Sequence, residues 1–274
     1  MRAYRFLYGS LLCLLLFLAA LPRARAAGAE GMTLLLDGAR AEFSSPCFIE
    51  DGVSYAPLGD FARAMGGCEV VWTGRDALVT ADGLTLRAAP DTPWIEANGR
   101  FFYVPGGVRL TGGRIFLPLS VLARVWPMEL RWDGGTRTVS AARVSGGFPE
   151  SGETFYPAEK LDLLARIISA ESQGEPLAGQ IAVGTVVLNR VASPDFPDTM
   201  EGVVFQSGQF EPVDNGTVYL PPYSLSVVAA KLCLDGARAA GESLFFFAPA
   251  LSPGTWIVNN RTFCTAIGCH RFYL

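Results

Sequence analysis

The stretch "AEKLDLLARIISAESQGEPLAGQIAVGTVVLNRV", residues 158–191, decides the fold of the C-terminal part of this 274-residue chain. Its first half repeats apolar residues at spacings of three and four. These positions predict one buried helical face, formed by Leu161, Leu164, Ile167 and Ile168. Gly174 and Pro176 end that helix, and Pro176 can open a second one at its first position. The stretch therefore predicts two successive helices joined by a short acidic turn.

Two glutamates flank this turn. Glu171 continues the apolar face on the last turn of the first helix. There, burial and the negative end of the helix dipole both raise the pKa of a carboxyl group, which suits a general acid. Glu175 precedes the second helix, whose positive N-terminal end favours a carboxylate. Helix capping is therefore a sufficient explanation for Glu175.

The first 26 residues are typical of a secretory signal peptide. Arg2 and Arg5 precede an apolar run too short to span a membrane, and Ala24-Arg25-Ala26 follows as a cleavage motif. The alternative is an uncleaved signal anchor. We expect a secreted protein that begins near Ala27, with no later segment that contacts the membrane.

Composition argues against a nucleic-acid partner. The signal peptide holds four of the 22 basic residues and none of the 26 acidic ones, so the mature chain has an excess of eight acidic residues. Such a chain has no basic surface to neutralise a phosphate backbone. We also expect no metal and no cofactor, because the chain has a single histidine.

Five cysteines follow the signal peptide, an odd number for an exported chain. We expect disulfides between Cys47 and Cys68 and between Cys264 and Cys269, with at least one thiol left over. The alternative, a metal site made by Cys264, Cys269 and His270, lacks a second ligand pair with zinc-like spacing.

An internal repeat marks the N-terminal part. The segment "GVSYAPLGDFARAMGGCEVVWTGRDALVT" from Gly52 matches "GRIFLPLSVLARVWPMELRWDGGTRTVS" from Gly113, at an offset of about sixty residues. Each copy predicts a strand, a Pro-Leu step into a helix and a returning strand that ends in tryptophan. We expect the aligned leucine, alanine and tryptophan positions, including Trp72 and Trp132, to be core residues.

This repeat resembles the copper amine oxidase N-terminal-like domain, a stalk module of secreted bacterial proteins, over residues 32–142. The resemblance implies a spacer or wall-binding role and no copper site. Residues 143–157 are rich in Gly, Pro, Ser and Glu, which predicts a linker.

Residues 158–274 resemble the SleB/CwlJ-type cell wall hydrolases. The blocks "SAESQGEP", "VVFQSGQFEPV", "LFFFAP" and "TFCTAIGCHRFY" occur in the order found in that family. The resemblance implies a lysozyme-like helical fold that cleaves peptidoglycan glycan strands, with Glu171 as the acid/base residue. The predicted fold class is therefore α+β, with a two-repeat module of strands and helices before a mainly helical catalytic domain.

Further residues are candidates for substrate binding: Glu175, Gln206, Gln209, Phe210, Trp256 and His270. The glutamines would bind sugar hydroxyl and acetamido groups, and Phe210 would stack on a sugar ring. An ordered polar loop is the alternative for this block. Trp256 would line the same groove or pack in the core, and His270 matches a histidine of the family's closing block.

The predicted activity is cleavage between N-acetylmuramic acid and N-acetylglucosamine by a lytic transglycosylase, which leaves 1,6-anhydro-muramic ends. This choice rests on the absence of an obvious second carboxylate other than Glu175. Hydrolysis completed by Glu175 or a water, and a non-catalytic wall-binding protein, are the alternatives. The expected partners are peptidoglycan and other wall or spore-coat proteins, in the cell wall or spore envelope.

Overall fold

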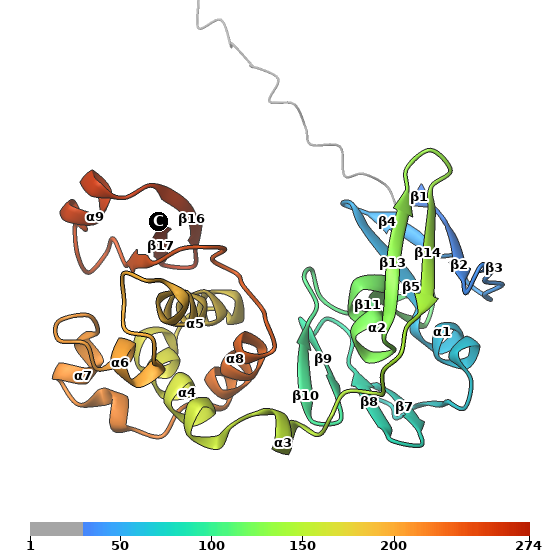
Figure 1. Ribbon diagram of the computed structural model, residues 1–274, viewed down its shortest axis with the longest axis horizontal. Helices are drawn as coiled ribbons and strands as arrows, with labels where there is room; N and C mark the ends of the chain where they lie inside the picture. The colour runs from blue at the N-terminus through green and yellow to red at the C-terminus, as the bar shows by residue number, and fades with distance from the viewer. Residues whose placement is uncertain (1–29) are drawn as a thin grey trace, which may run out of the picture.

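The computed structural model describes residues 30–274, which form a strand-rich half and a helical half (Figure 1). The predicted signal peptide, residues 1–26, lies outside the described residues. Within the described part, no helix has the length and apolar character needed to cross a membrane. The expected α+β class, with a two-repeat module before a mainly helical domain, is confirmed.

Three sheets build the strand-rich half. The first has the order β1 (Glu30–Gly31), β4 (Phe48–Glu50), β5 (Val53–Pro57), β12 (Arg114–Pro118) and β11 (Arg109–Thr111). The second has the order β10 (Arg100–Tyr103), β9 (Trp94–Ala97), β8 (Leu84–Ala88), β7 (Ala77–Ala81) and β6 (Glu69–Trp72). The third has the order β13 (Met128–Asp133), β14 (Thr138–Arg143), β2 (Thr33–Leu36) and β3 (Ala39–Arg40). Strands β14 and β2 pair in parallel.

The internal repeat is confirmed as two copies of one strand, helix and hairpin unit. A Pro-Leu step leads β5 into α1 (Leu58–Met65) and β12 into α2 (Leu119–Val125). The leucine of each step is buried, as expected. Strands β5 and β12 pair with each other inside the first sheet, so the two copies share one core.

The expectation that the aligned tryptophans are core residues is wrong. Trp72 and Trp132 are 51% and 52% exposed, whereas the aligned Val79 and Val139 are buried. The reason is that β6 and β13 are edge strands, which leaves one side of each strand without a neighbouring strand. Trp126, directly after α2, is a tryptophan that does pack in this core.

The helical half is built around three helices: α4 (Ala158–Ser172), α5 (Leu177–Ala192) and α8 (Ser224–Leu234). The two successive helices predicted from residues 158–191 are confirmed; on the predicted face of α4, Leu164, Ile167 and Ile168 are buried and Leu161 is partly buried. Gly184 allows α5 to approach α4 closely, because a Cβ atom at position 184 would lie 2.7 Å from Cδ1 of Ile168 on α4.

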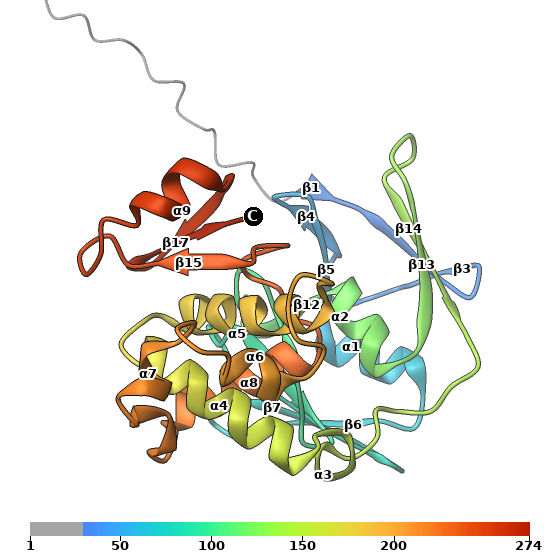
Figure 2. The same ribbon diagram turned by 60° about the vertical axis from the view of Figure 1, so that its left-hand side comes forward.

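Shorter elements complete this half: α6 (Met200–Val204), α7 (Glu211–Asp214), the 3-10 turn η1 (Thr217–Tyr219) and α9 (Thr255–Asn260). A three-stranded antiparallel sheet has the order β15 (Phe245–Phe247), β17 (His270–Tyr273) and β16 (Phe263–Ile267). This sheet packs on α5, as Figure 2 shows. It brings the turn between β16 and β17 next to the start of α5.

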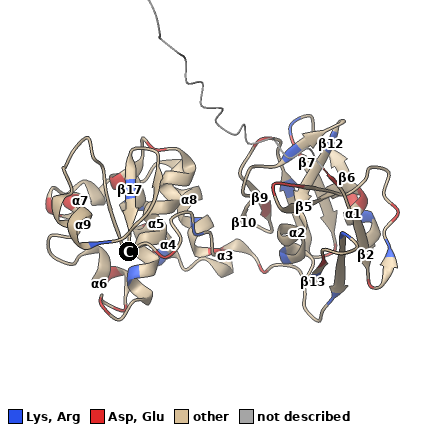
Figure 3. Ribbon diagram, turned by 90° about the horizontal axis from the view of Figure 1, so that it is seen from above, with Lys and Arg blue, Asp and Glu red and all other residues tan. Residues whose placement is uncertain are grey.

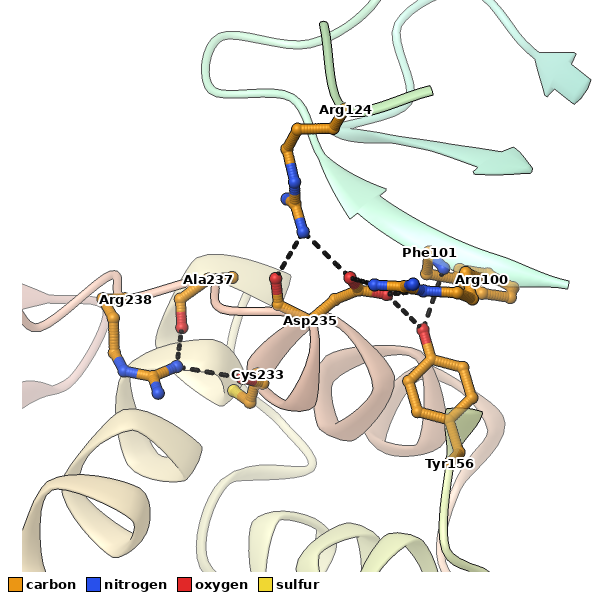
Figure 4. A network of polar contacts seen from close by, with 8 residues as sticks. All are labelled: Arg100, Phe101, Arg124, Tyr156, Cys233, Asp235, Ala237 and Arg238. Atoms are coloured by element: carbon orange, nitrogen blue, oxygen red, sulfur yellow. Dashed lines mark hydrogen bonds and ion pairs between the residues drawn. The ribbon is translucent and has the colours of Figure 1, made fainter. Parts of the chain in front are cut away.

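A buried carboxylate, Asp235, joins the two halves (Figure 4). It follows α8, and its side chain is 1% exposed. Arg100 and Arg124 donate to Oδ1 at 2.6 Å and 2.9 Å, and the hydroxyl of Tyr156 donates to Oδ2 at 2.7 Å. Two positive charges and a hydroxyl thus compensate the desolvation of this carboxylate.

The segment predicted as a linker, residues 143–157, packs against the strand-rich half. It contains α3 (Gly152–Phe155), and the backbone N–H of Gly152 donates to the carbonyl oxygen of Asn98 at 2.8 Å. A Cβ atom at Gly152 would collide with the backbone of Gly99, so glycine is required for this close approach. The segment therefore connects the halves as part of their packed interface.

The expected disulfides are not formed. Cys47, Cys68, Cys233, Cys264 and Cys269 are all free thiols. Cys264 lies at an irregular position of the β16–β17 pair and Cys269 in the turn between these strands, so their sequence proximity does not make them partners.

Candidate active site

A cavity of about 400 Å³ lies between the C-terminal end of α4, helix α7 and the segment that follows α7. Polar residues line much of it: Arg166, Ser169, Glu171, Gln173, Glu211, Asn215 and Thr217. Leu220, Tyr223 and Leu251 add apolar and aromatic surface. Mixed polar and aromatic linings of this kind are suited to sugar rings, which present both hydroxyl groups and apolar faces.

Local hydrogen bonds hold the rim of this cavity. Arg166 donates from Nη1 to the carbonyl oxygens of Tyr219 and Leu220, at 2.7 Å and 3.1 Å. The hydroxyl of Ser169 accepts from the backbone N–H of Tyr223 at 3.2 Å. Helix α4 thus fixes the loop that faces Glu171.

Glu171 lies in this cavity, on the penultimate residue of α4. Burial raises the pKa of its carboxyl group to about 7, and the neighbouring charge of Glu211 adds to this shift. The positive charge of Arg190 acts in the opposite direction. At neutral pH the carboxyl group is therefore poised to give up a proton and to take one back.

Glu211 is a cavity residue that sequence reasoning missed. It is the first residue of α7, it is exposed, and it lines the same cavity as Glu171. The Glu-Pro step of Glu211 and Pro212 repeats the one at Glu175 and Pro176, and this was the signal available in the sequence. Because Glu211 lies far from Glu171 in the sequence, no local pattern shows that the two carboxyl groups line one cavity.

Arg190 was also missed. It is 4% exposed, and burial lowers the pKa of its guanidinium group to about 10. The sequence offered no signal beyond the fact that Arg190 is the one charged residue of α5.

Glu175 lies outside the cavity and supports the C-terminal hairpin. Its Oε2 atom accepts a hydrogen bond from the backbone N–H of Cys269 at 2.9 Å, and its Oε1 atom lies 3.9 Å from Nδ1 of His270. The expected cap on the second helix is not formed, since α5 has no side-chain cap. His270 is 7% exposed, and burial lowers its pKa. Both residues therefore lie at the C-terminal hairpin, and sugar contacts by them remain predictions.

The remaining candidates do not line the cavity of Glu171. Phe210 is 2% exposed, so it has no free face for a sugar ring, and it packs on Phe246. Gln206 is half-buried and Gln209 is exposed. Trp256 is 57% exposed and contacts Phe245 edge to face, with ring centroids 6.0 Å apart. Direct sugar contacts by these residues remain predictions.

A larger hollow, of about 770 Å³, lies in the strand-rich half but lacks a comparable acid. Hydrogen bonds from Arg143 lower the pKa of Asp37. Burial would raise the pKa of Asp60, but hydrogen bonds from Ser44 and Arg63 outweigh it and lower the pKa. Both carboxyl groups are therefore charged at neutral pH, so we assign the chemistry to the cavity of Glu171.

Residues 30–274 contain no group of three or more His, Cys, Asp and Glu side chains that could hold a metal ion. Basic and acidic residues are interspersed over both halves (Figure 3).

Two family models match the chain. The cell wall hydrolase family matches residues 174–273, and the copper amine oxidase N-terminal domain matches residues 35–141. The first match contains most of the helical half, and the second contains most of the strand-rich repeat.

Individual proteins are similar to the helical half. A spore cortex-lytic enzyme of Bacillus cereus is 37% identical over 117 residues, which cover 43% of this chain and 45% of that protein. The cell wall hydrolase CwlJ of Bacillus subtilis is 32% identical over 120 residues, which cover 41% of this chain and 83% of that protein. The solved catalytic domain of the germination-specific lytic transglycosylase SleB of Bacillus anthracis is 35% identical, with a TM-score of 0.41, and 43% of this chain covers 97% of it. The chain thus spans less than half the length of the Bacillus cereus relative.

Proposed function

Because the chain belongs to the cell wall hydrolase family, we propose that it cleaves the glycan strands of peptidoglycan. The bond cleaved is the one between N-acetylmuramic acid and N-acetylglucosamine, and the reaction is that of a lytic transglycosylase. The names of its relatives, spore cortex-lytic enzymes, support the spore cortex as the substrate. Secretion through the signal peptide of residues 1–26 would bring the protein to that wall.

One observation carries the proposal: Glu171 combines a cavity position with a pKa raised to about 7. Its protonated carboxyl group donates to the glycosidic oxygen, and the bond from this oxygen to the muramic C1 breaks. The electron pair stays on the oxygen, which becomes a hydroxyl group of N-acetylglucosamine. The 6-hydroxyl of the muramic residue then attacks C1 and returns its proton to the Glu171 carboxylate. No water is consumed, so a single acid/base residue is sufficient.

Hydrolysis would require a second carboxylate as nucleophile or water activator. Glu175 is unsuited, because its carboxylate is bound to the backbone of Cys269 outside the cavity. Among the described residues, Glu211 is the other carboxylate that lines the cavity. It is therefore the residue that a hydrolytic mechanism would use in this chain.

The test is mass spectrometry of the soluble fragments released from spore cortex and from vegetative peptidoglycan. Wild type is compared with Glu171→Gln, and with Glu242→Gln as a control that removes an exposed acid outside the cavity. We expect anhydro-muramic ends from wild type and the control, and none from Glu171→Gln.

Each other result has a definite meaning. Reducing muramic ends would contradict the transglycosylase reaction and make Glu211 the next residue to substitute. If no fragments are released and the protein sediments with the wall, it is a non-catalytic binding protein.

A further inference from the structure

Arg190 is buried without a carboxylate partner. Its Nε donates to the carbonyl oxygen of Leu244 at 2.8 Å, but its Nη1 atom is buried and has no hydrogen-bond partner. In the described part of the chain, no ion pair within 4.0 Å involves Arg190. An unpaired buried charge costs stability, so its retention requires an explanation.

Aromatic rings hold this guanidinium group in place. Its Cζ lies 4.9 Å from the ring centre of Phe196, 5.2 Å from that of Phe210 and 5.7 Å from that of Phe245. Such contacts stabilise a cation but do not satisfy an N–H donor that points elsewhere. Apolar surroundings also exclude water, which strengthens any interaction of the guanidinium group with a negative charge.

Arg190 does not line the cavity itself, but α5, which carries it, packs on α4, which carries Glu171. Phe210, on which Arg190 packs, directly precedes Glu211, a cavity residue, and the charges of Arg190 and Glu171 influence each other. Other charged or titratable groups near Glu171 are Glu211, Arg166 and Tyr223. Glu211 has the wrong charge, and Arg166 is already bound to Asp162 and to backbone carbonyl oxygens. Arg190 is therefore the available positive partner.

We propose that Arg190 is a positioning residue for the general acid, whose unpartnered Nη1 binds the Glu171 carboxylate that remains after proton donation. This role rests on the proposed acid/base function of Glu171. In the protonated form from which the reaction starts, the carboxyl group is neutral and needs no cation. After the proton passes to the glycosidic oxygen, the guanidinium group compensates the new charge until the muramic 6-hydroxyl returns a proton.

The experiment follows the carboxyl carbon of Glu171 by ¹³C NMR during a pH titration of the full chain, with the resonance assigned by its loss in Glu171→Gln. Arg190→Gln should raise the titration midpoint by roughly one pH unit, because an opposite charge near a carboxyl group is lost. Arg190→Lys keeps the charge and should stay near wild type. Arg238→Gln is the control, since Arg238 also binds backbone carbonyl oxygens but, unlike Arg190, does not act on the pKa of Glu171.

A second measurement needs no variant at Arg190. The guanidinium nitrogen and carbon signals of Arg190 in wild type should shift with the midpoint of Glu171, and this response should vanish in Glu171→Gln. If Arg190→Gln folds with an unchanged midpoint, or if the Arg190 signals do not respond, the proposal is overturned.

The product assay separates this inference from the proposed function. If the Glu171 and Arg190 signals respond to each other but the wall is not cleaved, the proposed function is contradicted and the Arg190–Glu171 pair is still supported. If the wall is cleaved but the Glu171 and Arg190 signals do not respond to each other, only the proposed role of Arg190 is overturned.

Discussion

Glu175 and Cys269, 94 positions apart in the chain, are joined by a hydrogen bond of 2.9 Å from the backbone N–H of Cys269 to Oε2 of Glu175. The side chain of Glu175 is 11% exposed, whereas Cys269 at the other end of the bond is exposed. A charged acceptor in this setting fixes the β16–β17 turn on the start of α5. Glu175 therefore contributes to the stability of the helical half.

Glu175→Ala should destabilise the protein by about 1–3 kcal/mol, because the N–H of Cys269 loses its acceptor. Urea unfolding measures this loss, with Glu242→Ala, an exposed acid, as the control. Wall cleavage per folded molecule should stay at the wild-type level. If a stably folded Glu175→Ala variant no longer cleaves the wall, Glu175 is a substrate-binding residue, as the sequence analysis predicts.

Glu171→Gln should stabilise the protein at high pH. The folded pKa of about 7 lies above the ordinary value of 4.5, so the unfolded chain releases this proton first as the pH rises. Stability is therefore lost between these two values, and the loss reaches about 3 kcal/mol above pH 7. Urea unfolding should show this gain for Glu171→Gln at pH 8 and no gain at pH 4. An equal gain at both pH values would show that the pKa of Glu171 is not raised.

Glu211→Gln should shift the pH dependence of wall cleavage. The charge of Glu211 raises the pKa of Glu171, so its removal lowers that pKa. Because the protonated acid is the active form, the alkaline limb of the profile should move to lower pH, by roughly half a unit. The maximal rate should change little. Loss of all cleavage at every pH would instead indicate that Glu211 is the second catalytic carboxylate of a hydrolase.

Asp235→Asn should cost about 3–5 kcal/mol, since it leaves the buried guanidinium of Arg100 without its counter-charge. Asp37→Asn is the matched control, because Asp37 pairs with Arg143 at the exposed surface. Calorimetry should show one transition for wild type and the control, and separate transitions of the two halves for Asp235→Asn. An unchanged single transition would mean that the network does not join the halves.

The sequence was sufficient to predict features that depend on residues close together in the chain. The spacing of Leu164, Ile167 and Ile168 was enough to place α4, its buried face and Glu171 at its end. The repeat was likewise visible, because each Pro-Leu step begins a helix. These features depend on residues within a few positions of one another.

Features that depend on distant contacts were missed or misread. The bond from Cys269 to Glu175, and the cavity shared by Glu171 and Glu211, exist only after the chain has folded. Trp72 was expected in the core because it aligns with Trp132 in the internal repeat, but its position on an edge strand depends on the order of the sheet. The sequence pattern carried no information about that order.

Asp235 gives the two halves a common orientation, because it binds Arg100 and Arg124 of one half from the end of a helix in the other. If the strand-rich half rests on the wall, this common orientation sets how far the cavity of Glu171 reaches from the wall surface and at what angle it meets a glycan strand. Bonds nearer to or farther from that surface than this fixed reach would be spared.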